Sequence, residues 1–517
     1  MNHIARSTLI IAVFFGIDKI LGFTRQLIVA RQFSLSYDLD VFNAANNAPD
    51  LLSALISGGA LGVALIPVLS ENLEQRGRRA AWDIFSRIIN LGFIVTAVIS
   101  ILIAIFAPWL ITNVIAPGFP VEQKALTVEL MRLDLMAILI FSISGLVMAG
   151  LQANQHFLLP AMAPGLYNIG QIFGAGILAP QTGYQIGPIT LPAFGFGIHG
   201  LVYGVIIGAA LHLAIQVPGL LKYEFKWVPK IDLRHPEVIK VLKLLGPRVA
   251  TMFFIQMFFI VRDNLASGLG EGSVTALNLG WFIMQVPETL LGTAIAIAIL
   301  PTLSEIFSRG DRPEFSKTVN TAVRILLALT IPSALLMAVG VRPLVTAAFA
   351  FDAAGTDMVV FAARAYLIGL AGHALLEISA RSFYAQQNAI IPLFAAGFNA
   401  ALYLLIANLL SRQWGYIGIA IANSIAFTTE AFILLWLLNR RFPGLLHIGS
   451  TLKRIIPGTL LAGGGLYLLM TSVPGSPLII SLVGMAAGMV VMLPFILPEI
   501  KLLLRMNPQR ASLGRTP

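Results

Sequence analysis

Long apolar stretches, separated by short polar, glycine-containing or charged segments, run through the whole chain. A helix needs about 20 apolar residues to cross the hydrocarbon core of a bilayer, and about fourteen stretches of this kind can be marked. They lie near residues 7–32, 41–70, 86–113, 126–154, 158–180, 197–221, 238–266, 274–304, 316–340, 357–385, 390–411, 415–439, 451–471 and 476–503. The pattern predicts an all-α polytopic membrane protein with about 14 transmembrane helices.

The composition agrees with a chain embedded in a membrane. Of the 517 residues, 57% are apolar and 11% are charged, whereas soluble domains carry about 25% charged residues. The chain has no cysteine, which excludes disulfides and thiolate metal sites, and its seven histidines form no cluster with metal-ligand spacing. We therefore expect neither a metal nor a cofactor.

Basic residues gather in every second predicted loop. They are Arg76, Arg78, Arg79, Lys222, Lys226, Lys230, Arg234, Arg309, Arg312, Lys317, Arg440, Arg441, Lys453, Arg454 and the basic residues of the C-terminal tail. This positive-inside pattern predicts that both termini lie in the cytoplasm. It also accounts for the net charge of +10 without nucleic acid, because the basic residues form no continuous stripe. The apolar run at 7–17 leads into Asp18 and Lys19 without a cleavage site, so the first span should be retained.

Three short sequences recur in the same order, roughly 220–235 residues apart. IPVLSE at 66–71 returns as LPTLSE at 300–305, ANQH at 153–156 as AQQN at 385–388, and GIHGL at 197–201 as GYIGI at 415–419. The offset covers about six spans, and an even number preserves orientation, so the repeat is parallel. It predicts two six-helix lobes, at 1–225 and 226–445. Residues 446–517 would add two further spans and a basic cytoplasmic tail.

Ionisable residues stand inside several predicted spans, where each costs at least about 2.5–3.5 kcal/mol on insertion scales. Such residues normally face a cavity or a partner. The candidate substrate-binding residues are Lys19, Arg25, Asp40, Asn47, Asp50, Arg262 and Asp263. Basic side chains in a cavity indicate an anionic ligand such as a phosphate. Another reading is open for residues near span ends, which can extend to the interface: Arg31, Asp40, Glu129 and Arg381.

A second group of residues is a candidate for gating or coupling. Pro49 stands beside Asp50 and is expected to kink the second span, because proline removes a helix hydrogen bond. Glu288 lies inside the eighth span. His373 and Glu377 are four residues apart and share a helix face, so they form either a structural pair or a protonation site.

Several short motifs in the sequence resemble those of a known family. LGFTR at 21–25, IVAR at 28–31, DVF at 40–42, Pro49, GAL at 59–61 and IPVLSE at 66–71 resemble the MurJ/MviN family. LAS at 265–267, GSVTAL at 272–277, Pro287 and LPTLSE at 300–305 are similar to its seventh and eighth spans. The resemblance covers nearly the whole chain. It implies a flippase of the multidrug/oligosaccharidyl-lipid/polysaccharide exporter superfamily that moves lipid II by alternating access between two lobes, in the cytoplasmic (inner) membrane.

The sequence departs from the family pattern at several positions. The basic pair of the first span is present as Lys19 and Arg25, but the basic position of the second span falls at Ser53 or Ala54. The acidic position before the Gly-Ala pair is Gly58, and the basic position of the eighth span is Phe282. In the seventh span the usual acidic-then-basic order is reversed, as Arg262 followed by Asp263. The cavity is therefore expected to be less basic than in the family.

The leading hypothesis is a flippase for a polyprenyl-diphosphate-linked saccharide, most simply lipid II, with membrane lipids and a coupling ion as further partners. Two related alternatives are a flippase for another polyprenyl-linked oligosaccharide and a cation-coupled drug antiporter. The third is a membrane enzyme such as a polyprenyl-phosphate glycosyltransferase, which needs a carboxylate-rich aqueous site. No predicted loop is long enough to supply such a site, and the chain has no P-loop motif. We therefore expect a transporter and not an enzyme.

Overall fold

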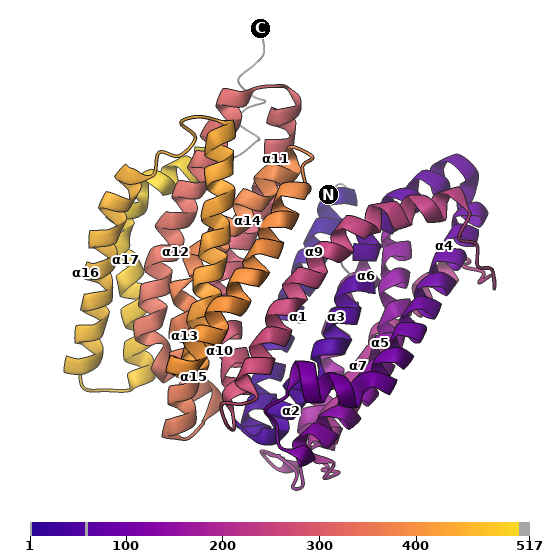
Figure 1. The fold of residues 1–517 in the computed structure, drawn as a ribbon, viewed down its shortest axis with the longest axis horizontal. Helices are drawn as coiled ribbons and strands as arrows, with labels where there is room; N and C mark the ends of the chain where they lie inside the picture. Colours follow the sequence, from indigo (N-terminus) through magenta and orange to yellow (C-terminus); the bar gives the residue numbers. More distant parts are fainter. Residues whose placement is uncertain (1–2, 57–59, 506–517) are drawn as a thin grey trace. The chain divides into compact units, whose positions relative to one another are not determined.

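The computed structural model describes residues 3–56 and 60–505, and these are almost entirely helical (Figure 1). The helices are α1 (His3–Phe33), α2 (Tyr37–Ala45), α3 (Asn47–Ile56), α4 (Ala60–Leu110), α5 (Val121–Ala153), α6 (Leu158–Phe173), α7 (Gly197–Ala214), α8 (Val217–Lys222), α9 (Pro236–Ala266), α10 (Ser273–Pro287), α11 (Ala294–Ser308), α12 (Arg312–Phe349), α13 (Ala353–Ile368), α14 (Leu370–Ala385), α15 (Ile390–Arg441), α16 (Gly449–Ser472) and α17 (Pro477–Arg505). Three π-helical segments continue α4, α6 and α10: η1 (Ile111–Ile115), η2 (Gly174–Leu178) and η3 (Glu288–Thr293). The predicted all-α polytopic class is confirmed.

One predicted loop contains a small exception to the helical fold. The strands β1 (Gln185–Ile186) and β2 (Ile189–Thr190) pair antiparallel between η2 and α7. Gly187 in the turn between them has a φ of 60°, which glycine adopts at little cost because it has no Cβ. The hairpin lies within residues 181–196, which the sequence pattern places between two predicted spans.

The predicted spans coincide with helical segments, but the helix boundaries differ. Two predicted loops are instead short breaks within long helices: Gly77 in α4, with a φ of 78°, and Gly415 in α15, with a φ of 58°. Conversely, the predicted second span is divided among α2, α3 and the start of α4. Glycine permits the left-handed backbone at both breaks, so the chain direction changes there without a long loop.

Eight helical segments among the described residues are long and apolar enough to cross a membrane, or nine if the bent pair α13 and α14 counts as one span. The bend between these two helices is 44° and lies at Gly369. This count takes each of the long helices α4 and α15 as one segment, whereas the sequence pattern divides each of them into two spans. The expectation of about fourteen crossings therefore stays a prediction.

The chain forms two compact units, Met1–Thr275 and Ala276–Pro517. The first unit therefore includes α9, which sequence analysis assigns to the second lobe. The units are defined by contacts in space, and the predicted lobes are defined by the sequence repeat. The two divisions can differ because a helix can pack on the lobe that precedes it in the chain. The predicted lobe boundaries remain predictions.

Close glycine contacts pack α6 and its continuation η2 against α7 in the first unit. A Cβ built on Gly170 would lie 2.3 Å from the Cα of Gly208, and one built on Gly174 would lie 2.6 Å from the Cα of Gly204. Neither contact leaves room for any larger residue. Small residues let membrane helices approach in this way, and close packing then stabilises the pair.

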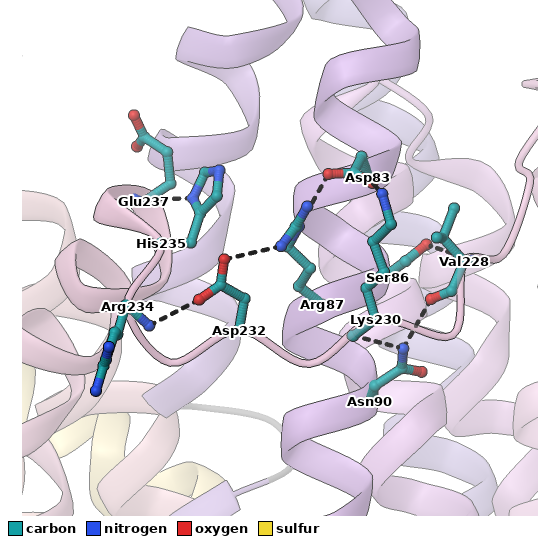
Figure 2. Close-up of polar contacts among 10 residues, drawn as sticks. All are labelled: Asp83, Ser86, Arg87, Asn90, Val228, Lys230, Asp232, Arg234, His235 and Glu237. Carbon is teal, nitrogen blue, oxygen red and sulfur yellow. Dashed lines mark hydrogen bonds and ion pairs between the residues drawn. The ribbon is translucent and has the colours of Figure 1, made fainter.

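The segment between α8 and α9 is fastened to α4 by polar contacts (Figure 2). Arg87 donates to Asp83 at 2.9 Å within α4 and to Asp232 at 3.1 Å in the connecting segment. Asn90 donates to the backbone carbonyls of Val228 and Lys230 at 2.8 and 3.0 Å. These contacts order a stretch without regular secondary structure, so α9 begins from a fixed position on α4.

In the second unit, a buried carboxylate connects the two C-terminal helices to α12. Glu499 of α17 accepts hydrogen bonds from Arg324 of α12 at 2.9 Å, from Arg454 of α16 at 2.7 Å and from Thr451 of α16 at 2.8 Å. In Figure 1 these two helices lie beside α12. The tail from residue 506 onward lies outside the described residues.

Candidate functional site

The predicted substrate-binding residues all lie in the first unit, on α1, α2, α3 and α9. The structure gives them three different environments: a helix cap, a buried ion-pair network and a more accessible charged group. Gly58, at the acidic position expected from the family resemblance, lies outside the described residues.

Asp40 caps the start of α10, a contact that the sequence did not predict, and its part in substrate binding stays a prediction. Its carboxylate accepts hydrogen bonds from the backbone N–H of Gly272 at 2.7 Å, and from the N–H and hydroxyl of Thr275 at 2.7 and 2.6 Å. The residue is 1% exposed, so it does not extend to the membrane interface either. A carboxylate at a helix N-terminus satisfies free N–H groups and favours the helix dipole. We therefore assign Asp40 a structural role.

Asn47, Arg262 and Asp263 form one buried network between α3 and α9. The Asp263 carboxylate accepts from Asn47 Nδ2 at 2.7 Å and from Arg262 Nε at 2.7 Å. The guanidinium of Arg262 also lies 5.1 Å from the ring of Phe259. Arg262 is thus buried and engaged with a carboxylate, and the predicted part of this network in substrate binding stays a prediction.

Arg25 and Asp50, by contrast, are less buried and act on each other electrostatically. Asp50 of α3 is exposed and Arg25 of α1 is half-buried. The charge of Arg25 acts on Asp50, and the charges of Arg262 and Asp263 act on it as well. Charged side chains of two other helices, α1 and α9, therefore act on this one carboxylate of α3. The cavity role expected for Lys19, Arg25 and Asp50 stays a prediction.

Lys19 lies further along α1 and is accessible. Its side chain is 61% exposed, with its ammonium 4.0 Å from Asp18 and 4.9 Å from the ring centre of Phe15. Asp18 itself accepts a hydrogen bond of 2.9 Å from Asn168 of α6. Lys19 and Arg25 are six positions apart on the helix, a rise of about 9 Å. The two basic side chains are therefore separated along α1, and their joint role in ligand binding stays a prediction.

Pro49 does not kink a continuous span as predicted. It is buried in the first turn of α3, which starts at Asn47 after a break at Asn46. Proline is tolerated in the first turn of a helix, because its missing N–H would have no partner within the helix there. The change of direction therefore comes from the break between α2 and α3, and Pro49 favours the restart of the helix.

The remaining gating candidates lie in the second unit. Glu288 begins the π-helical segment η3 and accepts a hydrogen bond of 3.0 Å from Thr293, and the charge of Arg381 acts on it. Glu377 forms an ion pair with Arg381, and His373 contacts Asn423 at 3.1 Å through Nε2. His373 and Glu377 thus have separate partners, so their spacing does not mark a mutual pair.

Asp134 is a residue whose importance sequence analysis misses. It lies in α5, is 2% exposed, and neither carboxylate oxygen has a hydrogen-bond partner among residues 3–56 and 60–505. The charge of Asp50 acts on it. Its position inside a predicted span is a signal in the sequence, but the lack of partners is visible only in three dimensions.

Comparisons with known proteins identify the family of this chain. The family profile described as lipid II flippase MurJ matches residues 29–488. The lipid II flippase MurJ of Burkholderia cenocepacia is 30% identical over 455 residues, 85% of this chain and 84% of that protein. The probable lipid II flippase MurJ of Buchnera aphidicola subsp. Acyrthosiphon pisum is 26% identical over 423 residues, 81% of this chain and 80% of that protein.

Solved structures show the same fold. The lipid II flippase MurJ in an inward closed conformation superposes with a TM-score of 0.78 at 24% identity, covering 96% of this chain and all of that one. An inward-facing multidrug transporter of the MATE family superposes with a TM-score of 0.67 at 14% identity, covering 83% of this chain and 95% of that one. The family profile spans most of the sequence, including both helical units, and the chain therefore belongs to the MurJ family.

Proposed function

We propose that this protein is a flippase that moves lipid II across the bacterial inner membrane by alternating access. The observation that carries the proposal is the family match over residues 29–488, together with a relative that is 30% identical and is named a lipid II flippase. The helices long and apolar enough to span a membrane support a multi-pass membrane protein. The basic loops support the placement of both termini in the cytoplasm.

Lys19 and Arg25 are the proposed ligands of the diphosphate. Both belong to α1, and both have accessible surface with which to meet a ligand. Arginine can hold a phosphate with two parallel hydrogen bonds, and lysine contributes a point charge. Asp50, whose charge interacts with that of Arg25, would balance the guanidinium charge while no ligand is bound. Arg262 and Asp40 are left out of this group because their polar atoms bind within the protein.

Each unit has its own buried polar network, which supports movement of the units as whole bodies. In the first unit Asp263 connects α3 with α9, and in the second Glu499 connects α12 with α16 and α17. Packed bodies that change relative position around a fixed site are the usual basis of alternating access. The C-terminal helices would then move together with α12.

A drug antiporter is the weaker alternative. The similarity to MATE transporters concerns the fold alone, since the identity is 14%. Folds of this kind host several functions, so the choice depends on family membership and on the site. The MurJ family is a family of flippases, and this chain also has the two C-terminal helices, α16 and α17, that the sequence repeat leaves outside the lobes.

Complementation tests the proposal. A bacterial strain depleted of its own lipid II flippase is given a plasmid copy of this chain, and growth and cell shape are recorded. We expect restored growth with the wild-type chain and loss of rescue with R25A at equal protein level. Lack of rescue by a well-expressed wild-type copy would count against lipid II. R309A serves as the control, because Arg309 is an exposed arginine in an ion pair with Glu305.

A further inference from the structure

Asp134 is a carboxylate in an environment that does not suit a negative charge. It lies in the middle of α5, 2% exposed, and both of its oxygens lack a hydrogen-bond partner among the described residues. Burying an ionised carboxylate without partners costs several kcal/mol or more, and such a group usually becomes neutral instead. The form that fits this conformation is therefore the protonated acid.

The surroundings of Asp134 supply few other charges. The elements packed on α5 are α2, α3, α4, α6, α7, α8 and η1. Their charged or titratable groups, within the described residues, are Asp50 of α3, Tyr167 of α6, Tyr37, Asp38 and Asp40 of α2, His199, Tyr203 and His212 of α7, Lys222 of α8, and the charged residues of α4 between Glu71 and Arg87. The helix α5 itself also carries Glu122, Lys124, Glu129 and Arg132. Residues 88–110 of α4 and all of η1 carry no charge.

Most of these groups already have partners elsewhere. Asp40 caps α10, His199 contacts Glu129, and His212 contacts Ser144 at 2.6 Å. The groups that act electrostatically with Asp134 are Asp50 and Tyr167. The charge of Arg25 in turn acts on both Asp50 and Tyr167. Asp134 is thus the buried end of a group whose other carboxylate, Asp50, is exposed.

A proton fits this site better than a metal ion. No group of three or more His, Asp or Glu side chains suited to a metal occurs in the described part of the chain. A hard cation takes about six or more oxygen ligands, and a carboxylate of this kind would hold it only with several further oxygens around it. A proton needs one oxygen and removes the unfavourable charge.

We propose that Asp134 is a proton-binding site and that proton binding and release there drive the transport cycle. This inference rests on the proposed flippase function and adds the coupling ion to it. On binding, an O–H bond forms on the Asp134 carboxylate and its charge is lost. On release, the proton passes to water or to the accessible Asp50, and the carboxylate charge returns. Arg25, the proposed diphosphate ligand, acts on Asp50, so lipid binding and proton binding influence each other through this residue.

The experiment uses the full-length protein in vesicles and compares the wild-type chain, D134N and D134E. Lipid II transfer between leaflets is measured with equal pH on both sides and with an imposed pH gradient. If one proton moves with each lipid, a gradient of about one pH unit changes the ratio of lipid between the leaflets by up to about tenfold. We expect a gradient response in the wild-type chain, its loss in D134N and its partial return in D134E. E430Q is the matched control, because Glu430 is also buried but accepts a hydrogen bond of 2.6 Å from Asn399.

The outcomes separate the two proposals. A wild-type chain that moves no lipid II under any condition overturns the proposed function. A wild-type chain that moves lipid II without any response to the gradient overturns proton coupling alone. A gradient response that D134N retains assigns the proton to another residue and overturns the role of Asp134.

A second measurement needs no substrate and covers the case in which D134N folds but transports nothing. Infrared difference spectra between acidic and alkaline pH, taken on the protein in lipid nanodiscs, report the C=O stretch of protonated carboxyls. We expect a buried-carboxyl band that D134N removes and E430Q preserves. A spectrum unchanged in D134N would show that Asp134 does not exchange a proton.

Discussion

The side-chain amide of Asn47 donates a hydrogen bond of 2.7 Å to the carboxylate of Asp263, across 216 residues of sequence. The same carboxylate binds the guanidinium of Arg262 at 2.7 Å, and all three side chains are buried. The contact joins the start of α3 to the end of α9 within the first unit. Three residues that the sequence predicts as ligand-binding thus join α3 to α9. The helix α3 also carries the accessible Asp50.

D263A should strongly destabilise the protein. Removal of one partner leaves the Arg262 charge buried without its carboxylate, which costs about 3–5 kcal/mol. The measurement is the apparent unfolding temperature in detergent. The control is E305A, which removes an ion pair with Arg309 whose side chains are 59% and 68% exposed and should change stability by at most about 1 kcal/mol. Equal, small shifts for both variants would contradict a structural role for the buried pair.

D40A should lower stability without changing the intrinsic affinity for lipid II. The substitution removes the acceptor at the start of α10, and loss of such a cap costs about 0.5–2 kcal/mol. D40N retains one acceptor oxygen and should have an intermediate effect. Unfolding temperatures and binding of lipid II to the folded fraction are measured together. Weaker binding by a D40A protein of wild-type stability would restore Asp40 to the list of ligands.

R25A should weaken lipid II binding by about 10- to 100-fold, because a hydrogen bond to a charged group contributes about 1.5–3 kcal/mol. R25K should lose less, since it keeps the charge but not the paired donors. Binding is measured on purified protein in detergent, with K19A as a second variant and R309A as the control. Unchanged affinity in both R25A and K19A would rule out α1 as the diphosphate site.

G170A should disturb the packing of α6 on α7. The added methyl group would lie 2.3 Å from the Cα of Gly208, and overpacking of this kind costs about 1–3 kcal/mol. G176A is the matched control, because a Cβ there meets no atom within 4 Å. Unfolding temperature and detergent stability should fall for G170A alone. If both variants behave alike, the close approach of α6 and α7 does not contribute to stability.

Much of the fold could be predicted from the sequence because apolar length and glycine positions are local signals. The predicted boundaries near residue 77 and at 412–414 fall beside Gly77 and Gly415, where the helices break. The site was less accessible to prediction. Asp40 caps a helix whose residues lie 232 and 235 positions away, and no local pattern contains that pairing.

The charges inside the spans show the same limit. In the sequence, Asp134, Asp50 and Asp263 look alike, because each is an ionisable residue in an apolar segment. The structure distinguishes them, because Asp263 has two polar partners, Asp50 is exposed and Asp134 is buried with no hydrogen-bond partner in the described residues. Partners and accessibility depend on helix packing, so the role of each carboxylate follows only from its neighbours.

The most direct test of the flippase assignment is transfer of lipid II by the purified chain in vesicles. Lipid II is placed in one leaflet, and its arrival in the other is followed by access to a membrane-impermeant enzyme that modifies the head group. The assignment predicts transfer by the wild-type chain, a strong reduction by R25A and no change by R309A. Vesicles that contain folded wild-type protein but show no more transfer than protein-free vesicles would contradict it.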